Sequence, residues 1–243
     1  MTAIQTIDLT KKFKKRTAVD SLNLSVEKGE LFALLGLNGA GKTTTIKMLC
    51  CLLSPTSGDA VLMGDSILRQ PAAVKQKINS SPQETAVAPN LSVKENLELI
   101  ARIYGSNRSQ ARSKADETMQ SFGLSDRSKD KAKTLSGGLQ RRLSIAMALI
   151  SNPEIAFLDE PTLGLDVVAR RELWNVMKGL KGKITMVLTT HYLEEAEALS
   201  DRIGILHEGR LKALGTAEQL KQETGKTSFE EAFLALAEAE VQA

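Results

Sequence analysis

The sequence predicts an α/β fold, because short apolar runs typical of buried strands alternate with helical patterns along the chain. One such run, Leu31–Leu35, leads directly into a glycine-rich turn and then into a helical pattern. The segment from about residue 84 to residue 150 is mostly helical, whereas strand-like runs return after it. We therefore expect a strand-bearing core whose two halves are separated in the sequence by a helical insertion.

Composition and charge are those of an ordinary globular chain. The 243 residues are 42% hydrophobic and 25% charged, which excludes a disordered or collagen-like chain. The longest uninterrupted apolar run, Met48–Leu53, is far shorter than the roughly 18 residues that span a membrane. We therefore expect a soluble, cytosolic protein. The 32 Lys and Arg against 29 Asp and Glu give a net charge of +3, which demands no polyanionic partner.

The first strand–helix unit consists of Leu31–Leu35 and a helix predicted from Lys42 to about Leu53. Cys50 and Cys51 fall within this helical run. Because adjacent cysteines cannot build a disulfide framework or a metal site, we interpret them as small buried hydrophobic residues.

The helical insertion shows both a start signal and apolar stripes. Ser92 and Glu95 have the spacing of a capping box, which favours a helix start at this point. Three apolar stripes at helical spacing follow: Val93, Leu97, Ile100 and Tyr104; Ala111, Ala115, Met119 and Phe122; and Leu139, Leu143, Ala146 and Ile150.

Strand-like runs return after the insertion, at Ile155–Leu158, Ile184–Leu188 and Ile203–Leu206. Asp166 can cap a helix that follows the first of these runs and whose inward face is Ala169, Leu173, Val176 and Leu180. Glu208-Gly209 predicts a hairpin turn, and Thr227–Ala243 predicts a helical tail rich in Ala and Glu.

A glycine-rich loop between the first strand and its helix fits the pattern G-x-x-x-x-G-K-[ST] in the context that this motif requires. This phosphate loop consists of Gly36, Leu37, Asn38, Gly39, Ala40, Gly41, Lys42 and Thr43, and Thr44 follows it as a further nucleotide-binding candidate. Glycines let backbone N–H groups surround a phosphate, and the following helix presents its positive end to the anion. Lys42 adds a charge at the β- and γ-phosphates, and Thr43 offers a hydroxyl to Mg²⁺.

Two carboxylates, Asp159 and Glu160, directly follow the strand-like run Ile155–Leu158, at the sheet edge where open α/β sheets bind ligands. Because adjacent strand residues point in opposite directions, the two side chains can serve different partners. We assign Asp159 to Mg²⁺ through water and Glu160 to the attacking water as general base. The alternative is a pair of exposed turn acids, and the nearby phosphate loop favours the functional interpretation.

A second possible anion site is Leu135-Ser136-Gly137-Gly138. Ser136 can cap the following helix, while Gly137 and Gly138 leave the backbone N–H groups exposed at its positive end. Taken alone, this pattern favours an ordinary glycine-containing helix start over an anion site.

The order of these motifs resembles the nucleotide-binding subunit of ATP-binding cassette (ABC) transporters, over essentially the whole chain. The Leu-Ser-Gly-Gly element shortly before an apolar-Asp-Glu-Pro strand is highly specific to that family. The resemblance implies a P-loop NTPase (RecA-like) core with an N-terminal antiparallel β portion and an inserted helical subdomain. It implies a single domain over residues 1–243, with the core at 1–83 and 151–215, the insertion at about 84–150 and a helical tail at 216–243.

The resemblance also implies that two cassettes pair head to tail and enclose ATP and Mg²⁺. One chain supplies its phosphate loop, and the other supplies Ser136, Gly137 and Gly138. Asp166 resembles the family's aspartate at the dimer seam, where Ser136 and Gly138 also lie. The second cassette is expected to be an identical chain.

Three further residues match the family's nucleotide contacts. Phe13 resembles an aromatic that stacks on adenine, although a core phenylalanine is a fair alternative. Gln83 resembles a glutamine that contacts Mg²⁺ and water and couples to the membrane partner. His191 resembles a histidine that contacts the γ-phosphate, whereas a lone histidine is ordinarily a surface or core residue. Leu139 stands where the family commonly has glutamine, and Gln140 follows it.

The function implied by the resemblance is ATP hydrolysis that powers a transmembrane permease formed by another chain. The pattern is similar to cassettes of bacterial exporters of drugs, antibiotics or lipid and polysaccharide. The expected location is the cytoplasmic face of the cell membrane, where the permease holds the chain. An importer cassette or a soluble, non-transport ABC ATPase is the alternative. No nucleic-acid partner is expected. The basic stretch 105–143 contains Phe122 but no other aromatic residue that could stack on a base.

Overall fold

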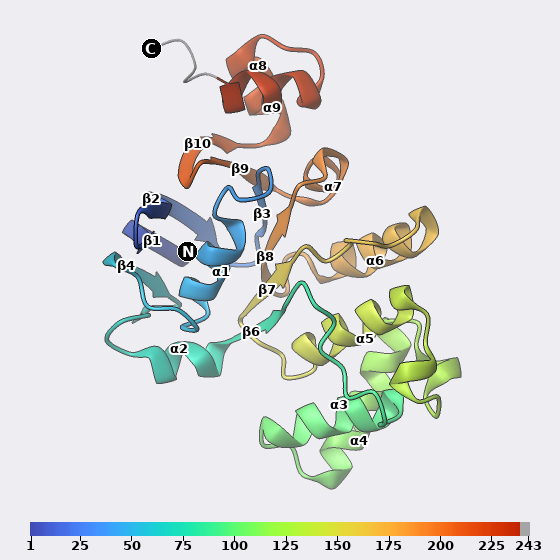
Figure 1. Cartoon of the computed structure of the whole chain (residues 1–243). Helices are drawn as coiled ribbons and strands as arrows, with labels where there is room; N and C mark the ends of the chain where they lie inside the picture. The colour runs from blue at the N-terminus through green and yellow to red at the C-terminus, as the bar shows by residue number, and fades with distance from the viewer. Residues whose placement is uncertain (239–243) are drawn as a thin grey trace.

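Two β-sheets and the helices that cover them make up the structure, a computed structural model that describes residues 1–238 (Figure 1). The larger sheet has six strands in the order β10-β9-β3-β8-β7-β6. All neighbouring pairs are parallel except β9 and β10, which form a hairpin. The strands are β3 Leu31–Leu35, β6 Ile78–Ser81, β7 Ile155–Asp159, β8 Thr185–Thr190, β9 Arg202–His207 and β10 Arg210–Gly215.

The smaller sheet is antiparallel and has four strands in the order β2-β1-β4-β5. Its strands are β1 Thr2–Phe13, β2 Arg16–Glu27, β4 Ser57–Leu62 and β5 Asp65–Ser66. The two sheets confirm the predicted α/β fold class with its N-terminal antiparallel β portion.

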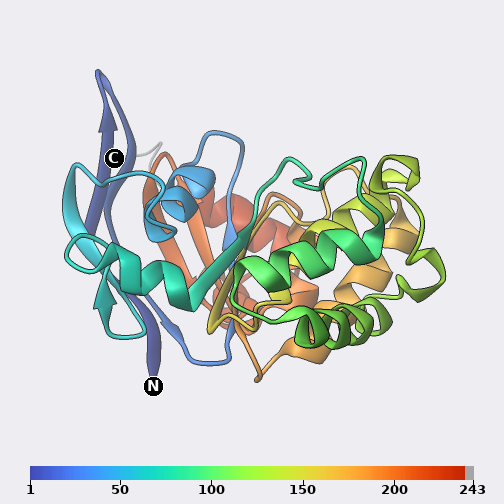
Figure 2. The same ribbon diagram turned by 90° about the horizontal axis from the view of Figure 1, so that it is seen from below.

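Nine α-helices occur within residues 1–238, and three of them gather at one end of the molecule, away from the small sheet (Figure 2). That group is α3 Val93–Ile103, α4 Arg108–Ser121 and α5 Gly137–Leu149, with 3₁₀ turns at Ser125–Arg127 and Ala132–Thr134. The others are α1 Lys42–Leu49, α2 Pro71–Lys77, α6 Val167–Leu180, α7 Leu193–Leu199, α8 Ala217–Thr224 and α9 Phe229–Glu238. No helix in this described part is both long enough and apolar enough to cross a membrane.

Alternating side chains of the central strand β3 belong to two separate hydrophobic cores. Leu31, Ala33 and Leu35 join a core with residues of α5, α6 and α7, whereas Phe32 and Leu34 join a core with α1 and the small sheet. All five side chains are buried, so β3 is fixed from both faces. The loop that follows β3 therefore starts from a rigid support.

The first helix is shorter than predicted. Helix α1 begins at Lys42 as expected but ends at Leu49, so its prediction to about Leu53 is wrong. Cys50 closes the last turn, and Cys51 then adopts a left-handed backbone with φ of 54°. The chain leaves the helix axis at this residue, which apolar character alone does not reveal.

Two other helix predictions also differ from the structure. Tyr104 lies beyond the end of α3 at Ile103 and is 45% exposed, so it does not belong to the buried stripe. The helix expected over Thr227–Ala243 begins at Phe229 as α9, and a separate helix, α8, precedes it within the tail expected to be helical from residue 216. Residues 239–243 of that predicted helix lie outside the described residues.

A buried amide connects the segment before α3 to that helix. Asn96 is fully buried, and its Oδ1 accepts a hydrogen bond from the Ala88 N–H at 2.8 Å. Its Nδ2 donates to the carbonyl oxygens of Ala88, Leu91 and Ser92 at 3.1, 3.3 and 2.9 Å. Asn96 is therefore the partner of the Ala88 N–H, and it adds a second hydrogen bond to carbonyl oxygens that also accept from backbone N–H groups.

Asn96→Ala is expected to lower the free energy of unfolding by about 2 kcal/mol, because it removes the hydrogen bonds of a buried amide and leaves the Ala88 N–H without its acceptor. Urea denaturation followed by circular dichroism measures this change. Glu98→Ala on the same helix is the control and should shift the free energy by less than about 0.5 kcal/mol. Equal midpoints for the two variants would contradict the structural role of Asn96.

Candidate functional site

The phosphate loop connects β3 to α1 at the carboxyl edge of the large sheet, and its glycines are required by both backbone and packing. Gly39 and Gly41 have φ of 85° and 107°, which residues with a side chain rarely adopt. A Cβ on Gly36 would lie 2.3 Å from the carbonyl oxygen of Leu206, and one on Gly41 would lie 2.4 Å from that of Ala18. The loop conformation therefore depends on glycine at these positions.

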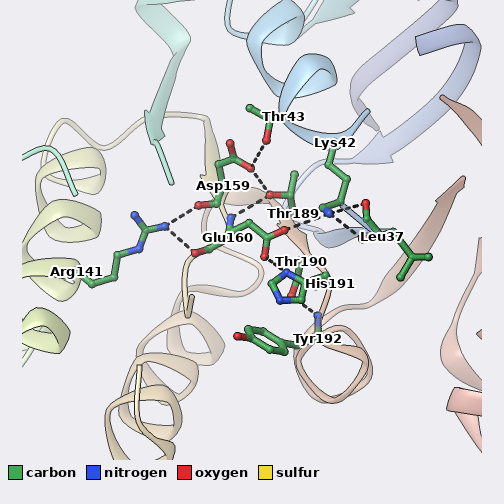
Figure 3. Close-up of polar contacts among 11 residues, drawn as sticks. Leu37, Lys42, Thr43, Arg141, Asp159, Glu160, Thr189, Thr190, His191 and Tyr192 are labelled. Carbon is green, nitrogen blue, oxygen red and sulfur yellow. Dashed lines mark hydrogen bonds and ion pairs between the residues drawn. The ribbon is translucent and has the colours of Figure 1, made fainter. Parts of the chain in front are cut away.

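Lys42, the lysine of this loop, is only 6% exposed and points back along the loop (Figure 3). Its Nζ donates to the carbonyl oxygens of Gly36 at 2.7 Å and Leu37 at 3.3 Å. It also forms an ion pair with Glu160 Oε1 at 3.2 Å. The cation is thus held between the phosphate loop and the loop after β7.

Glu160 lies one residue beyond β7 and has a left-handed backbone with φ of 48°. Its N–H donates to both the carbonyl oxygen and the hydroxyl of Thr189, at 3.2 and 3.0 Å, which stabilises this rare conformation. Its Oε2 lies 2.8 Å from His191 Nδ1. The carboxylate is thereby fixed between Lys42 and His191, in reach of both.

Asp159 makes a different set of contacts. It is 5% exposed, and its Oδ1 accepts hydrogen bonds from the hydroxyls of Thr43, at 3.2 Å, and Thr189. The two acids therefore have different partners, as predicted, but for another reason. The left-handed turn at Glu160 separates them, rather than the alternation of strand side chains alone.

The oxygen atoms of Thr43 and Asp159 suit Mg²⁺, which prefers hard oxygen ligands and usually keeps few protein contacts beside phosphate oxygens. The Thr43 hydroxyl and the Asp159 carboxylate are already 3.2 Å apart. No cluster of three or more His, Cys, Asp or Glu side chains that could hold a metal occurs within residues 1–238. A divalent ion here would therefore depend on these two residues and on oxygen atoms of the ligand.

A cavity of about 480 Å³ joins most of the predicted nucleotide contacts. Phe13 lines it and is 46% exposed, with Lys11 Nζ 5.2 Å from the ring centroid. The other predicted residues along its wall are Asn38, Gly39, Ala40, Gly41, Lys42, Thr43, Thr44, Gln83, Glu160 and His191. Gly36 and Leu37 contribute through their carbonyl contacts with Lys42. The volume and the open phosphate loop suit a mononucleotide.

The second predicted anion site lies in a different cavity of about 420 Å³. Ser136, Gly137, Gly138 and Asp166 line it. Ser136 and Asp166 both act as helix N-caps, through hydrogen bonds from the N–H groups of Leu139 at 3.4 Å and Ala169 at 2.9 Å. A single chain therefore does not bring this site together with its own phosphate loop.

The sequence motifs give no role to Arg141, whose guanidinium group donates to the backbone carbonyl oxygens of both acids. Its side chain is 3% exposed, and burial lowers the pKa of its guanidinium group, while the charges of Asp159, Glu195 and Glu160 oppose that effect. A signal was present in the sequence, because Arg141 shares the helical spacing of the buried residues Ile145 and Ala148.

Glu195 was also missed, and it lies fully buried behind His191. Its Oε1 accepts a hydrogen bond from Trp174 Nε1 at 3.2 Å. Burial raises the pKa of this carboxyl group above its ordinary value of 4.5, and polar neighbours, which include Trp174, partly offset that rise. The surrounding sequence, with Glu194 and Glu197 nearby, is typical of a solvated acidic face and does not indicate that Glu195 is buried.

Comparisons with known proteins converge on one family. The sequence model described as ABC transporter matches residues 19–163. A daunorubicin resistance ATP-binding protein, DrrA3 of Streptomyces coeruleorubidus, is 42% identical over 225 residues, which cover 92% of this chain and 71% of that protein. A solved ATP-binding subunit of an ABC transporter superposes with a TM-score of 0.86 at 30% identity and covers 96% of this chain and 99% of its own. A dimeric ATP-binding cassette in a post-hydrolysis state with ADP and Pi has a TM-score of 0.79 at 27% identity and covers 88% of this chain and 98% of its own.

Glu195→Gln is expected to change how stability depends on pH. As the pH rises above 4.5, the unfolded chain ionises Glu195 before the folded chain does, so the wild-type free energy of unfolding falls until the higher folded pKa is passed. Glutamine does not titrate, so the stability of the variant relative to the wild type should rise over that window, by about 1.4 kcal/mol for each unit of pKa difference.

Urea denaturation at intervals from about pH 4.5 to pH 8 measures this difference. Glu223→Gln, on the exposed face of α8, is the control for a surface carboxylate. A Glu195→Gln difference that stays constant with pH would show that Glu195 ionises normally in the folded chain.

Proposed function

This chain belongs to the ABC transporter family and is an ATPase, and we propose that it powers a drug exporter through a separate transmembrane permease. The drug-resistance name of a relative 42% identical to it supports this class of cargo. The observation that carries the catalytic part of the proposal is the Glu160 carboxylate, held between Lys42 and His191 at the phosphate loop.

Nucleotide binding would use the cavity beside the phosphate loop. Adenine stacks on Phe13, and the phosphates lie against the N–H groups of the loop and the positive end of α1. Lys42 then exchanges the Glu160 carboxylate for a phosphate oxygen, since both are anions within reach of its Nζ. Mg²⁺, held by Thr43, Asp159 and Gln83, would neutralise charge on the phosphates.

Hydrolysis follows from the release of Glu160 from Lys42. The carboxylate accepts a proton from a water molecule whose oxygen attacks the γ-phosphorus, while the bond from that phosphorus to the β–γ bridging oxygen breaks. The electron pair of the broken bond leaves on ADP. His191, 2.8 Å from Glu160, holds the carboxylate in position and lies near the γ-phosphate.

The complete site needs a second cassette, which we propose to be an identical chain. The Ser136-Gly137-Gly138 helix start and Asp166 lie in a cavity separate from the phosphate loop of the same chain, so they are available to a partner's nucleotide. A related cassette with a TM-score of 0.79 is dimeric. Two-fold pairing would create two equivalent sites.

Coupling to the permease would pass through the Gln83 segment and the helical insertion at about 84–150. Asn96 connects the segment that follows Gln83 to the start of α3, so these parts move together. The chain would then act at the cytoplasmic face of the membrane, held there by its permease. In this proposal the chain is one domain: residues 1–83 and 151–215 form its catalytic core, and a helical tail begins at residue 216.

Glu160→Gln is expected to lower the rate of ATP hydrolysis about 100-fold or more, because it removes the general base. Binding of ATP should persist, because the phosphate loop is unchanged. A phosphate-release assay gives the rate, and calorimetry with ATP and Mg²⁺ gives the affinity.

The matched control is Glu223→Gln, which makes the same chemical change on α8 and should hydrolyse ATP at the wild-type rate. A Glu160→Gln protein with wild-type turnover would refute the assignment of the base. Loss of ATP binding in that variant would refute the proposed division of roles.

A further inference from the structure

Arg141 connects helix α5 to the loops that carry the catalytic residues. It lies on the second turn of α5, whose N-cap is Ser136. Figure 3 shows its guanidinium group directed at the backbone of Asp159 and Glu160. Its N–H groups donate to the carbonyl oxygens of Pro161 at 2.9 Å, Gln83 at 3.1 Å, Asp159 at 2.7 Å, Glu160 at 3.0 Å and, by a short bond, Pro82.

These contacts use the whole donor capacity of the side chain. Nε makes one contact, and Nη1 and Nη2 make two each. A guanidinium group has five N–H donors in a rigid planar fork, whereas an ammonium group has three donors and no fixed plane. Lysine cannot reproduce this set of bonds, so the requirement at position 141 is for arginine rather than for positive charge.

The carbonyl groups belong to two loops, and Arg141 bonds to both of them. Pro82 and Gln83 follow β6, whereas Asp159, Glu160 and Pro161 end β7 and follow it. These segments carry Gln83 and Asp159, two of the three proposed metal ligands, and Glu160, the proposed base. A shift of α5 therefore moves the backbone of both loops through one buried side chain.

The N-terminus of α5, just before Arg141, carries the anion site proposed to face a partner's nucleotide. Ser136 and Arg141 are five residues apart, about 7 Å along the helix at 1.5 Å per residue. Gln140 lies between these two residues on the helix, and its Nε2 donates to the Leu135 carbonyl at 3.0 Å. A regular helix between the two points transmits a displacement rather than absorbing it.

We propose that Arg141 is a positioning residue that couples the nucleotide held at the Ser136 end of α5 to the Glu160 base of the same chain. This inference rests on the proposed two-chain function. In this arrangement a partner's ATP sets the position of α5, and Arg141 transfers that position to the Gln83 and Glu160 loops. Each site then reaches its hydrolytic geometry only when the other is filled.

The first test is Arg141→Lys, which retains the charge and loses the fork. Initial rates of ATP hydrolysis are measured against ATP concentration with the full chain. The kcat should fall about tenfold or more, since small displacements of a base slow the reaction strongly, while KM changes less than about threefold. The Hill coefficient should fall from its wild-type value towards 1, because the two nucleotide sites are no longer coupled.

The matched control for this change is Arg202→Lys. Arg202, in β9, also donates to a backbone carbonyl, that of Ser25, and to Glu30, but it contacts neither loop of the site. It should leave kcat and the Hill coefficient at wild-type values. A folded Arg141→Lys protein that matches Arg202→Lys in both quantities would overturn the inference.

A second pair of variants keeps Arg141 and decides the matter if Arg141→Lys does not fold. Gln140→Gly and Gln140→Ala lose the same side-chain hydrogen bond, but only glycine makes the helix flexible between Ser136 and Arg141. The Hill coefficient should fall in Gln140→Gly and stay at the wild-type value in Gln140→Ala. Equal Hill coefficients above 1 in both would overturn the coupling.

Different results would refute the proposed two-chain function and the role of Arg141. A wild-type chain without ATP hydrolysis, or a Glu160→Gln chain that never pairs in ATP, would refute the two-chain ATPase itself. A wild-type chain that hydrolyses ATP cooperatively, with an Arg141→Lys variant equal to its control, would refute only the role of Arg141.

Discussion

The buried ion pair between Lys42 and Glu160 is the interaction on which the rest of the site depends. Both side chains are about 6% exposed, so either charge left alone would cost several kcal/mol. Lys42 can leave Glu160 only for another anion, and a nucleotide phosphate is such an anion. Glu160 retains His191 as a partner when Lys42 leaves. In the proposed function, binding of the nucleotide and release of Glu160 from Lys42 are therefore one electrostatic exchange.

The surrounding fold fixes the positions of Lys42 and Glu160 relative to each other. Strand β3 is fixed by two cores, and it supports the phosphate loop that carries Lys42. Strands β7 and β8 present Glu160, Thr189 and His191 at the same edge of the sheet. Arg141 then ties the backbone at Glu160 to α5. Residues far apart in the sequence therefore share one rigid frame.

Motifs with local geometry were predictable from the sequence, and contacts that depend on tertiary packing were not. The glycine loop, the Ser92 capping box and the Asp166 cap follow from spacing alone. Arg141 is a buried cation whose hydrogen-bond donors find partners only in the folded chain, and Glu195 is a buried acid within an acidic run that is typical of a solvated face. The end of α1 depends on a left-handed Cys51, for which apolar patterning carries no information.

The affinity of the chain for ADP tests the Lys42–Glu160 exchange most directly, since ADP needs Lys42 but supplies no phosphate to hydrolyse. Calorimetry on Glu160→Gln should show ADP binding about tenfold tighter than in the wild type, because Lys42 no longer has to leave a carboxylate. Glu208→Gln, which removes a carboxylate beside the loop without touching Lys42, should leave the affinity nearly unchanged. An affinity in Glu160→Gln equal to or weaker than the wild-type value would contradict the exchange.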